Sequence, residues 1–461
     1  MDIIKLNELI YNKNILILGF GKEGKTSYQF LRKHFPNQLF TIADRDLQLL
    51  ENNNFLKNEN ISVKLGDDYL NDLVDFDLII KTPGISLKDF DIKLLNQLNI
   101  TSQTNLFLQL FSKQVIGITG TKGKSTTTTL IYHIIKSFTE NVILVGNIGI
   151  PPFEQVINVN NETIIVYEMS SHQLENISVS PHISILLNLF QEHLDHYQSY
   201  KDYQLAKFNI AKYQKNNDYF IYNADNDEIN IIKNENSFDG IQIPFSLETE
   251  TKSGAFLKDE IIYFIENKES KPFYSIKSNR YLKGKHNLLN IMAAIIACKL
   301  TNIPDETILK GIANFKGLEH RIEYVGNYNE IDFYNDSIST IPEASIAAIK
   351  ALENVDTLIL GGFDRGIDYK HFALFLIESD ITNLIFIGNA GKRIFEEIKN
   401  FGCFGKAFYE PTTYEEIVEI CFSVTAKGKT CLLSPAAASY DMFYNFEERG
   451  NFFKNLIINK F

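Results

Sequence analysis

A glycine-rich turn between an apolar strand and a helix pattern constrains this chain more than any other feature. The strand is expected at Val115–Ile118 and the helix at Thr126–Phe138, with the stretch Gly120-Thr121-Lys122-Gly123-Lys124-Ser125 around the turn. Backbone N–H groups at such a helix start can surround phosphate oxygens, Lys124 can neutralise phosphate charge, and the Ser125 hydroxyl can reach Mg²⁺. The turn predicts a nucleotide-phosphate site in an α/β fold, with a plain glycine turn and a solvated lysine as the alternative.

Short apolar runs alternate with helix patterns on both sides of this turn, which is typical of parallel α/β sheets. Residues 241–281 differ, and their short alternating runs suggest an antiparallel insertion. The strands expected elsewhere are Ile15–Leu18, Leu39–Ala43, Asp77–Ile80, Val142–Val145, Ile164–Tyr167, Ile183–Leu187, Ile331–Tyr334, Thr357–Leu360, Leu384–Ile387 and Thr430–Leu433. The helix pattern after the first strand is expected at Lys25–His34.

Length and charge narrow the class of protein. At about 150 residues per domain, 461 residues suggest about three domains. A net charge of −12 argues against broad nucleic-acid binding. The chain has no long apolar run and no Cys-x-x-Cys pair, so we expect no membrane span, signal peptide, zinc site or redox pair. These features favour a cytoplasmic globular protein.

A second glycine pattern, Gly19-x-Gly21-x-x-Gly24, follows the first expected strand. It encloses Lys22 and Glu23, and Asp44 lies 20 residues after Gly24 at the end of the next strand. This spacing is typical of a turn that binds the diphosphate of a nucleotide, with the acidic residue on the ribose. A tight strand–helix turn that needs small residues is the alternative reading.

Polar residues also follow two later strands of the expected sheet. Glu168 ends one strand, where a carboxylate could hold Mg²⁺, and His193 follows the next, where it could bind a metal or substrate. A capping glutamate and a structural histidine are the alternatives. Taken alone, Lys207 reads as a solvated lysine on a helix.

Two segments nearer the C-terminus add candidates. Asn287 could bridge ATP phosphates, and Asn290 could meet the adenine edge. Arg321 lies where the third α/β unit begins and could close onto a phosphate. An interdomain salt bridge is the other reading of Arg321.

Taken in order, these segments resemble the Mur ligase family, and within it the glutamate-adding enzymes. The resemblance covers essentially the whole chain. It is carried by Thr119–Thr126, Gly146–Gly149, Glu168–Ser171, Glu192–Asp195, Gly284–Asn287, His320–Arg321, Asn335–Ser337, Ser434–Ala436 and Asn445–Gly450.

The resemblance implies a Rossmann-like UDP-binding domain (1–111), a central ATPase-type domain (112–316) and a C-terminal Rossmann-like domain for glutamate (317–461). Two Mg²⁺ ions are implied, at Ser125, Glu168, His193 and Lys207, with Lys207 carbamylated. The implied ATP ligands are Gly120, Thr121, Lys122, Gly123, Lys124, Ser125, Thr126, Asn287, Asn290, Arg321 and Asp336. The implied contacts to the UDP-linked substrate are Gly21, Lys22, Glu23, Asp44, Thr82, Pro83, Gly84 and Asn147.

The glutamate site departs from the family's usual pattern. Ser439 and Phe446 match it, but Ile338 stands where the D-glutamate enzymes commonly have a lysine, and Arg365 stands for a second lysine. Arg is not a neutral replacement for Lys at a carboxylate. D-Glutamate is the family default, and these two positions make L-glutamate the alternative.

The activity implied by the resemblance is ATP-dependent addition of glutamate to UDP-N-acetylmuramoyl-L-alanine in peptidoglycan precursor synthesis. ATP would convert the substrate carboxylate to an acyl phosphate, with Lys124, Glu168, His193 and Lys207 as catalytic groups. We expect a monomer. A nicotinamide-dependent oxidoreductase is a remote alternative, and a non-catalytic nucleotide-binding regulator is another; neither gives the ordered motifs a role.

Overall fold

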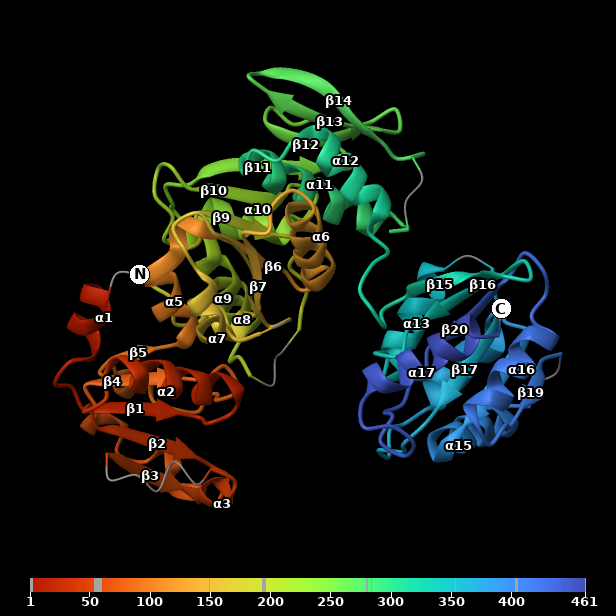
Figure 1. The fold of residues 1–461 in the computed structure, drawn as a ribbon, viewed down its shortest axis with the longest axis horizontal. Coiled ribbons are helices and arrows are strands. Elements are labelled where there is room, and N and C mark those ends of the chain that lie inside the picture. Colours follow the sequence, from red (N-terminus) through yellow and green to blue (C-terminus); the bar gives the residue numbers. More distant parts are fainter. Residues whose placement is uncertain are drawn as a thin grey trace. The chain divides into compact units, whose positions relative to one another are not determined.

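The chain forms two compact units in a computed structural model (Figure 1), which describes residues 3–53, 60–148, 150–192, 196–278, 281–282, 284–352, 354–402 and 405–460. Unit 1 comprises residues 1–278 and 285–313, and unit 2 comprises residues 279–284 and 314–461. Unit 1 holds two β-sheets and unit 2 holds one. The α/β prediction is confirmed, whereas the three domain boundaries stay a prediction.

The first sheet of unit 1 has the strand order β3-β2-β1-β4-β5, and all its pairs are parallel. Ile15 and Ile17 of β1 pack into one apolar cluster, while Leu16 and Leu18 pack into another. Such alternation within an entirely apolar strand is what a sheet covered on both faces requires. The strands are β1 (Ile15–Leu18), β2 (Phe40–Asp44), β3 (Ile61–Leu65), β4 (Leu78–Lys81) and β5 (Ile100–Thr101).

The second sheet of unit 1 has the order β14-β13-β12-β11-β10-β9-β6-β8-β7. Only the pairs β12–β13 and β13–β14 are antiparallel, and β11 pairs in parallel with both neighbours. The predicted insertion at 241–281 is therefore wrong in its first part, because β11 extends the parallel sheet. The strands are β6 (Val115–Thr119), β7 (Val142–Gly146), β8 (Ile164–Glu168), β9 (Ile183–Leu186), β10 (Tyr219–Asn223), β11 (Ile241–Ser246), β12 (Gly254–Lys258), β13 (Ile261–Glu266) and β14 (Glu269–Ser275).

The helices of unit 1 connect these strands. Two of them begin earlier than predicted, at Lys22 rather than Lys25 and at Lys124 rather than Thr126, because the glycine turns lead directly into the helices. The helices are α1 (Ile3–Ile10), α2 (Lys22–His34), α3 (Leu49–Asn52), α4 (Ile92–Leu95), α5 (Gln103–Phe111), α6 (Lys124–Lys136), α7 (Pro152–Gln155), α8 (Ser171–Leu174), α9 (Tyr200–Lys212), α10 (Asp227–Glu235), α11 (Lys285–Leu300) and α12 (Asp305–Asn314).

Unit 2 is built on one sheet with the order β15-β16-β20-β17-β18-β19. The β15–β16 pair is antiparallel and the others are parallel. Its elements are β15 (Glu323–Tyr328), β16 (Ile331–Asn335), α13 (Pro342–Ala351), β17 (Val355–Gly361), α14 (Lys370–Glu378), β18 (Asn383–Ile387), α15 (Gly388–Asn400), β19 (Ala407–Tyr409), α16 (Tyr414–Val424), β20 (Thr430–Leu433) and α17 (Phe446–Ile458).

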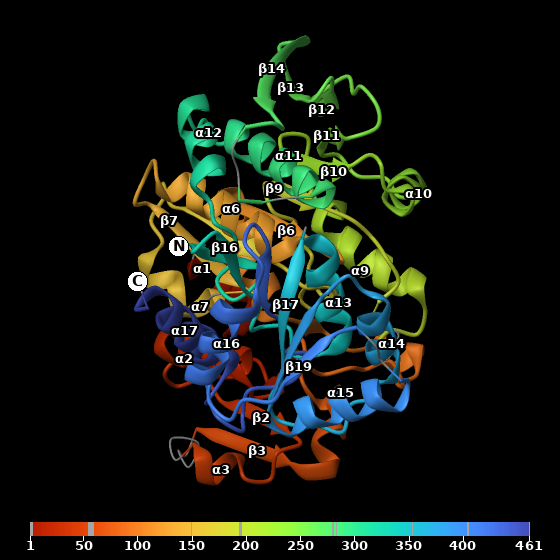
Figure 2. The ribbon, with the colours of Figure 1, turned by 90° about the vertical axis from the view of Figure 1, so that its right-hand side faces the viewer.

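Helices cover both faces of the unit 2 sheet (Figure 2). Leu358 and Leu360 of β17 pack with the helices α13, α14 and α15, while Ile359 packs with α16 and α17. The ligand-binding edge of such a sheet lies at the carboxyl ends of its parallel strands. In unit 2 that edge carries the segments after β16, β17 and β20.

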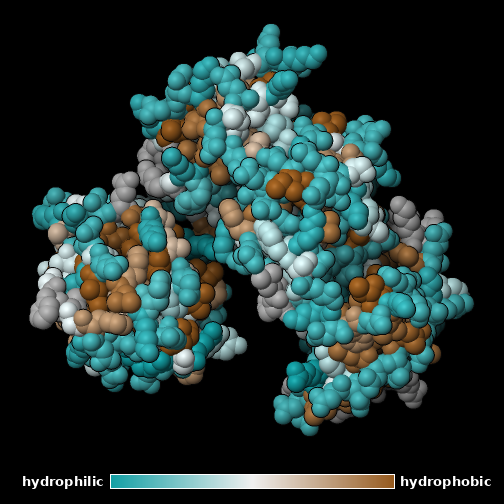
Figure 3. All heavy atoms as spheres, turned by 180° about the vertical axis from the view of Figure 1, so that it is seen from behind, coloured by the Kyte–Doolittle hydropathy of each residue, from teal (hydrophilic) through white to brown (hydrophobic). Residues whose placement is uncertain are grey.

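The surface seen in Figure 3 is mostly hydrophilic, with separate hydrophobic areas. Within the described part of the chain, no helix is long and apolar enough to cross a membrane. Cys298, Cys421 and Cys431 are buried free thiols, and Cys403 lies outside the described residues.

Candidate active site

The glycine-rich turn after β6 has the geometry of a phosphate loop. Gly120 (φ 156°) and Gly123 (φ 85°) both adopt backbone conformations that favour glycine. The Lys124 side chain folds back over the turn, and its Nζ donates to the carbonyl oxygens of Gly120 at 2.9 Å and Thr121 at 3.0 Å. The predicted cation therefore lies over the loop at the start of α6.

Two asparagines of α11 lie against the same loop. A Cβ atom at Gly123 would stand 2.6 Å from Oδ1 of Asn290, so only glycine fits between the turn and α11. Asn290 Nδ2 donates to Oδ1 of Asn287 at 3.0 Å. The structure thus brings together two predicted ATP contacts and the phosphate loop, across a long stretch of sequence.

Glu168 is a buried carboxylate at the end of β8, with 0% of its surface exposed. Its Oε1 accepts a hydrogen bond from Asn147 Nδ2 at 2.9 Å. Its Oε2 has no hydrogen-bond partner among the described residues. The capping or surface alternative for Glu168 is therefore wrong. A buried, unpaired carboxylate oxygen is costly unless a cation completes it, which fits a Mg²⁺ ligand.

Lys207 is buried in α9, with 2% of its surface exposed, so its reading as a solvated lysine is wrong. Its Nζ donates to the Gly120 carbonyl oxygen at 2.9 Å, beside the phosphate loop. Burial, together with the charge of Lys124, holds the pKa of Lys207 well below its ordinary value, although Glu192 and Glu168 oppose this. Burial therefore shifts the protonation equilibrium of Lys207 towards the neutral amine, the form that can react with carbon dioxide.

The segment after β9 also contacts the phosphate loop. Asn188 Oδ1 accepts from the Lys122 backbone N–H at 2.8 Å, and Lys122 Nζ pairs with Glu192 Oε1 at 2.6 Å. His193 lies outside the described residues. Sequence reasoning missed Asn188, although its place directly after a parallel strand was a usable signal.

Tyr203 is a second residue that sequence reasoning missed. Its hydroxyl lies 2.8 Å from Oγ1 of Thr121, and its ring lies 5.0 Å from the Nζ of Lys207. Thr121 Oγ1 also accepts from the Phe190 backbone N–H at 3.0 Å. Tyr203 therefore links the phosphate loop to α9; its spacing of one helical turn before Lys207 was the available signal.

The backbone geometry requires glycine at only some of the three glycine positions after β1. Gly19 has φ 88°, and a Cβ at Gly24 would lie 2.0 Å from the Gly19 carbonyl oxygen. Gly21 has φ −68°, and a Cβ there would meet no atom within 4 Å. The fold therefore requires Gly19 and Gly24 but not Gly21, which leaves open backbone where a ligand could approach.

Other residues predicted to bind the UDP-linked substrate lie near the turn that follows β1. Asp44 ends β2, and its carboxylate accepts backbone N–H bonds from Phe20 at 2.5 Å and Asp46 at 2.9 Å. Thr82 Oγ1 donates to the Leu18 carbonyl oxygen at 3.1 Å, which places Thr82–Gly84 beside β1. Lys22 and Gly84 are exposed, and Pro83 is half-buried.

In unit 2, Asp336 is buried directly after β16. Its Oδ2 accepts from the Ser434 hydroxyl at 2.7 Å and its Oδ1 from the Ile322 backbone N–H at 3.1 Å. Burial raises its pKa to about 6, against these hydrogen bonds and the nearby charge of Arg321. Arg321 itself is exposed.

The segments predicted to bind glutamate are joined by a buried arginine. The guanidinium of Arg449 donates to the Ser337 hydroxyl at 2.9 Å, the Ser337 carbonyl oxygen at 2.8 Å, and the carbonyl oxygens of Ala437 and Ala438, both at 3.1 Å. Ser337 Oγ in turn donates to the carbonyl oxygen of Phe446 at 2.8 Å. Ser439, next along the chain after Ala438, is buried.

Arg365 and Ile338, the two departures from the family pattern, are both exposed. The Arg365 guanidinium lies 5.3 Å from the ring centre of Tyr440. The neighbouring Asp364 pairs with Arg393 at 2.5 Å. Unit 2 therefore carries Arg321, Asp336 and the predicted glutamate residues, while unit 1 carries the phosphate loop.

A phosphate loop, a buried carboxylate with a free oxygen and a second nucleotide-type turn define a nucleotide-dependent α/β enzyme. Comparison with known proteins identifies the family. Residues 118–298 match the model of the Mur ligase middle domain. UDP-N-acetylmuramoylalanine–D-glutamate ligase of Acetivibrio thermocellus is 33% identical over 465 residues, covering 98% of both chains. The enzyme of the same name from Clostridium tetani is also 33% identical, covering 99% of both.

Solved structures agree on the fold. MurF ligase from Thermotoga maritima in complex with ADP has a TM-score of 0.54 and 16% identity, covering 99% of this chain and 97% of that one. UDP-N-acetylmuramate-alanine ligase from the same organism has a TM-score of 0.52 and 19% identity, covering 97% and 99%. The chain therefore belongs to the Mur ligase family, whose members are ATP-dependent amide-bond ligases.

Proposed function

We propose that this enzyme joins D-glutamate to the L-alanyl carboxylate of UDP-N-acetylmuramoyl-L-alanine, a step of peptidoglycan precursor synthesis. ATP would be converted to ADP and phosphate. The observation that carries the ligase chemistry is the buried Glu168 carboxylate near a phosphate loop that holds Lys124. The substrate assignment rests on the names of full-length relatives.

The reaction needs an activated carboxylate, because a carboxylate is a poor electrophile. The carboxylate oxygen attacks the γ-phosphorus of ATP, the bond to the bridging oxygen breaks, and ADP leaves. The glutamate amine then attacks the acyl phosphate carbon, loses a proton, and phosphate departs with the former carboxylate oxygen. Lys124 and the backbone N–H groups of its loop would bind the phosphoryl oxygens throughout.

Residues of unit 1 fit a magnesium ion. Glu168 offers a buried oxygen without a hydrogen-bond partner in the described chain, and Ser125 lies in the first turn of α6. We assign both as ligands of one Mg²⁺, and His193 with Lys207 as ligands of a second. When bound, such ions offset the negative charge of the phosphate groups.

We further propose that Lys207 is carbamylated. Its neutral amine would add carbon dioxide and release a proton, which leaves a carboxylate on the nitrogen. The depressed pKa of Lys207 and its place beside Gly120 support this, because the neutral amine is the reactive form. A carbamate would also convert a costly buried ammonium into a metal ligand.

The remaining predicted contacts divide between the two units. In unit 1, the turn at Gly21–Glu23, Asp44, Asn147 and the loop Thr82–Gly84 would bind the UDP-linked substrate. In unit 2, Arg321 and Asp336 would contact ATP, and Arg365, Ser439 and Phe446 would bind glutamate. We place the reaction in the cytoplasm, where ATP and UDP-linked precursors are made.

The handedness of glutamate is tested by incubating the enzyme with ATP, Mg²⁺, the UDP-linked substrate and either isomer. We expect phosphate release and product with D-glutamate. The L-glutamate alternative, which Ile338 and Arg365 suggested, is not favoured by the relatives' names. Phosphate release with neither isomer would contradict the proposed function.

A further inference from the structure

Segments from both sheets of unit 1 meet at one cluster of charged side chains, formed by Lys81, Glu175 and His196. Lys81 ends β4 and directly precedes the predicted diphosphate loop Thr82–Gly84. Glu175 directly follows α8, a short helix that begins three residues after Glu168. His196 belongs to the segment after β9. The cluster therefore connects the loop predicted to bind the substrate diphosphate with the segments that follow β8 and β9.

Lys81 is one of the few buried lysines, with 4% of its surface exposed. Its Nζ lies 3.1 Å from Oε2 of Glu175 and donates to the Ile85 carbonyl oxygen at 2.8 Å. A lysine is almost never buried unless its charge is paired. The Lys81 ammonium therefore already has protein partners, so a structural role fits it better than direct ligand binding.

Glu175 sits between two donors. Its second oxygen, Oε1, lies 2.7 Å from Nε2 of His196. Burial alone would raise the pKa of Glu175, but the His196 hydrogen bond and the charge of Lys81 outweigh it, and the pKa is lowered. The charged carboxylate is thus the favoured form, and it holds both side chains at fixed positions.

Further polar bonds run along the same junction between the two sheets. Gln173 of α8 donates to Oε1 of Glu23 at 2.6 Å, in the turn after β1. Ser86 Oγ donates to the His196 carbonyl oxygen at 3.2 Å, and Gln198 Nε2 donates to that of Lys88 at 2.6 Å. Every one of these bonds links a residue of the first sheet's region to one of the second.

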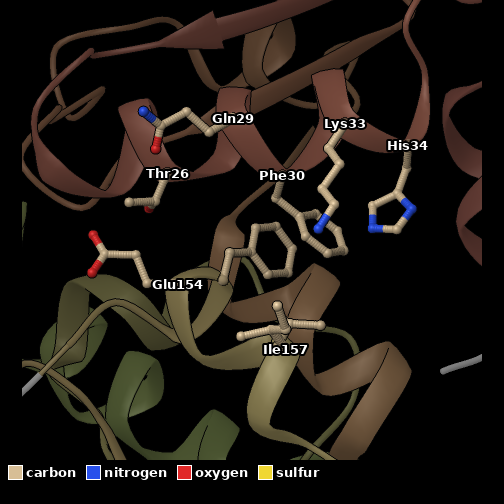
Figure 4. Close-up of a pocket in the computed structure, with 9 residues that line it drawn as sticks. Thr26, Gln29, Phe30, Lys33, His34, Glu154 and Ile157 are labelled. Atoms are coloured by element: carbon tan, nitrogen blue, oxygen red, sulfur yellow. The ribbon is translucent and has the colours of Figure 1, made fainter.

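The other part of the junction is apolar and incompletely filled. Phe30 of α2 and Phe153 of α7 stack with ring centres 4.1 Å apart. Beside them lies a hollow of about 420 Å³, whose rim includes Lys33, His34 and Glu154 (Figure 4). Apolar contacts are non-directional, so they hold the two sheets together without fixing their relative position. Ion pairs and hydrogen bonds are directional and can fix that position.

We propose that Lys81 is a positioning residue, which sets the diphosphate loop at a fixed distance from the phosphoryl-transfer site through Glu175. This role rests on the proposed function, because the substrate must span both places: its UDP at the first sheet and its carboxylate at the phosphate loop. A displacement of about 1 Å at either end can cost about 100-fold in rate. Within unit 1, the proposed ATP contacts lie on the phosphate loop and on α11, and none of them belongs to the Lys81–Glu175 ion pair.

The test replaces Lys81 in the full-length enzyme by methionine, which has a similar length and no charge. We expect kcat/KM for UDP-N-acetylmuramoyl-L-alanine to fall about 10- to 100-fold, while the Kd for ADP changes less than about twofold. Glu175→Gln, which keeps the shape of the side chain, should give the same pattern. The double variant should be no worse than either single variant, because both changes break one interaction.

Lys113→Met is the control for the loss of a lysine ion pair elsewhere in unit 1, although the Lys113 side chain is 65% exposed and that of Lys81 is 4% exposed. Lys113 forms an ion pair with Asp218 at 2.9 Å, but both residues lie in the second sheet's region, and the pair does not cross the junction. Its kcat/KM should stay at the wild-type value. Equal losses in the Lys81 and Lys113 variants would overturn the proposal, since any lost ion pair would then suffice.

Two other outcomes would also overturn the role of Lys81. One is an unchanged kcat/KM in Lys81→Met; the other is a parallel loss of ADP binding and Tm, which would show a merely structural role. An inactive wild type is a different result, because it would contradict the proposed function itself and remove the substrate that Lys81 is said to position.

Discussion

At the scale of single residues, Lys207 is buried, and burial disfavours the charged ammonium form of its side chain. We predict that Lys207→Ala lowers kcat by about 100-fold or more, because it removes the amine that we propose carries a carbamate. Activity of the wild type should rise with bicarbonate, and a small carboxylate such as acetate should partly restore the variant. Steady-state kinetics with and without these additions checks this.

Lys212→Ala supplies the control for that experiment. Lys212 lies on the same helix, α9, but is exposed to solvent. It should keep wild-type kcat and show no response to acetate. Full activity of Lys207→Ala without any added carboxylate would refute the role of Lys207.

Asp336 gives a prediction about pH. Burial raises its folded pKa from 3.8 to about 6, so the folded chain holds a proton that the unfolded chain releases at lower pH. Its contribution to stability is therefore fully present below about pH 4 and is lost as the pH rises to about 6. Relative to Asp336→Asn, wild-type stability should fall by about 3 kcal/mol across this window. Urea unfolding at several pH values measures it, and a constant difference between the two proteins would contradict the assignment.

At the scale of elements, the turn from β1 to α2 contains glycines that the fold requires and one, Gly21, that it does not require. Gly24→Ala should destabilise the fold by about 1 to 3 kcal/mol, because its Cβ would collide with the Gly19 carbonyl oxygen. Gly21→Ala should change stability by less than about 0.5 kcal/mol, since its surroundings are open, but should raise KM for the UDP-linked substrate. Thermal unfolding and kinetics of both variants test this. Equal KM values in Gly21→Ala and wild type would contradict a ligand at this turn.

The elements themselves were largely predictable from the sequence. Buried parallel strands are short and mostly apolar, so Ile15–Leu18 and Thr430–Leu433 were found with their bounds. The strands β5, which has two residues, and β15, which contains Gly326 and Asn327, were not predicted, and neither was the buried apolar strand β10. Residues of β11 were included in the predicted antiparallel insertion, which was wrong for this strand because periodicity does not distinguish a parallel from an antiparallel partner.

The candidate site was predictable where a residue ends a strand, as Glu168 does, because the carboxyl ends of parallel strands share one edge. Lys207 could not be read from its own segment, since its burial depends on the phosphate loop, which is far away in the sequence. The contacts of Arg449 were likewise not predictable, because Arg449 lies in α17 and its partners Ser337 and Ala437 lie in other segments of the chain.

At the scale of the whole molecule, the predicted ATP ligands are divided between two compact units. Arg321 lies in unit 2 and the phosphate loop in unit 1. We predict that Arg321→Ala lowers kcat/KM for ATP about tenfold or more without changing Tm, because an exposed side chain adds little to folding. Lys316→Ala, an exposed cation in the same unit, is the control. Identical kinetics of the Arg321 variant and wild type would exclude a role for Arg321 at the ATP phosphates.

The net charge of −12 makes these local cations more important, since the ATP, UDP and glutamate ligands are all anions. A chain with a negative overall charge gains no general attraction for such ligands. We therefore propose that binding depends on Lys124, Arg321, Arg365 and metal ions.

The most direct measurement follows the oxygen atoms of the substrate carboxylate. UDP-N-acetylmuramoyl-L-alanine labelled with ¹⁸O in that carboxylate is incubated with the enzyme, ATP, Mg²⁺ and D-glutamate, and the products are analysed by mass spectrometry. Activation through an acyl phosphate predicts one labelled oxygen in each phosphate released, an unlabelled ADP, and a product lengthened by one glutamyl residue. Unlabelled phosphate, or no glutamyl product, would contradict the account.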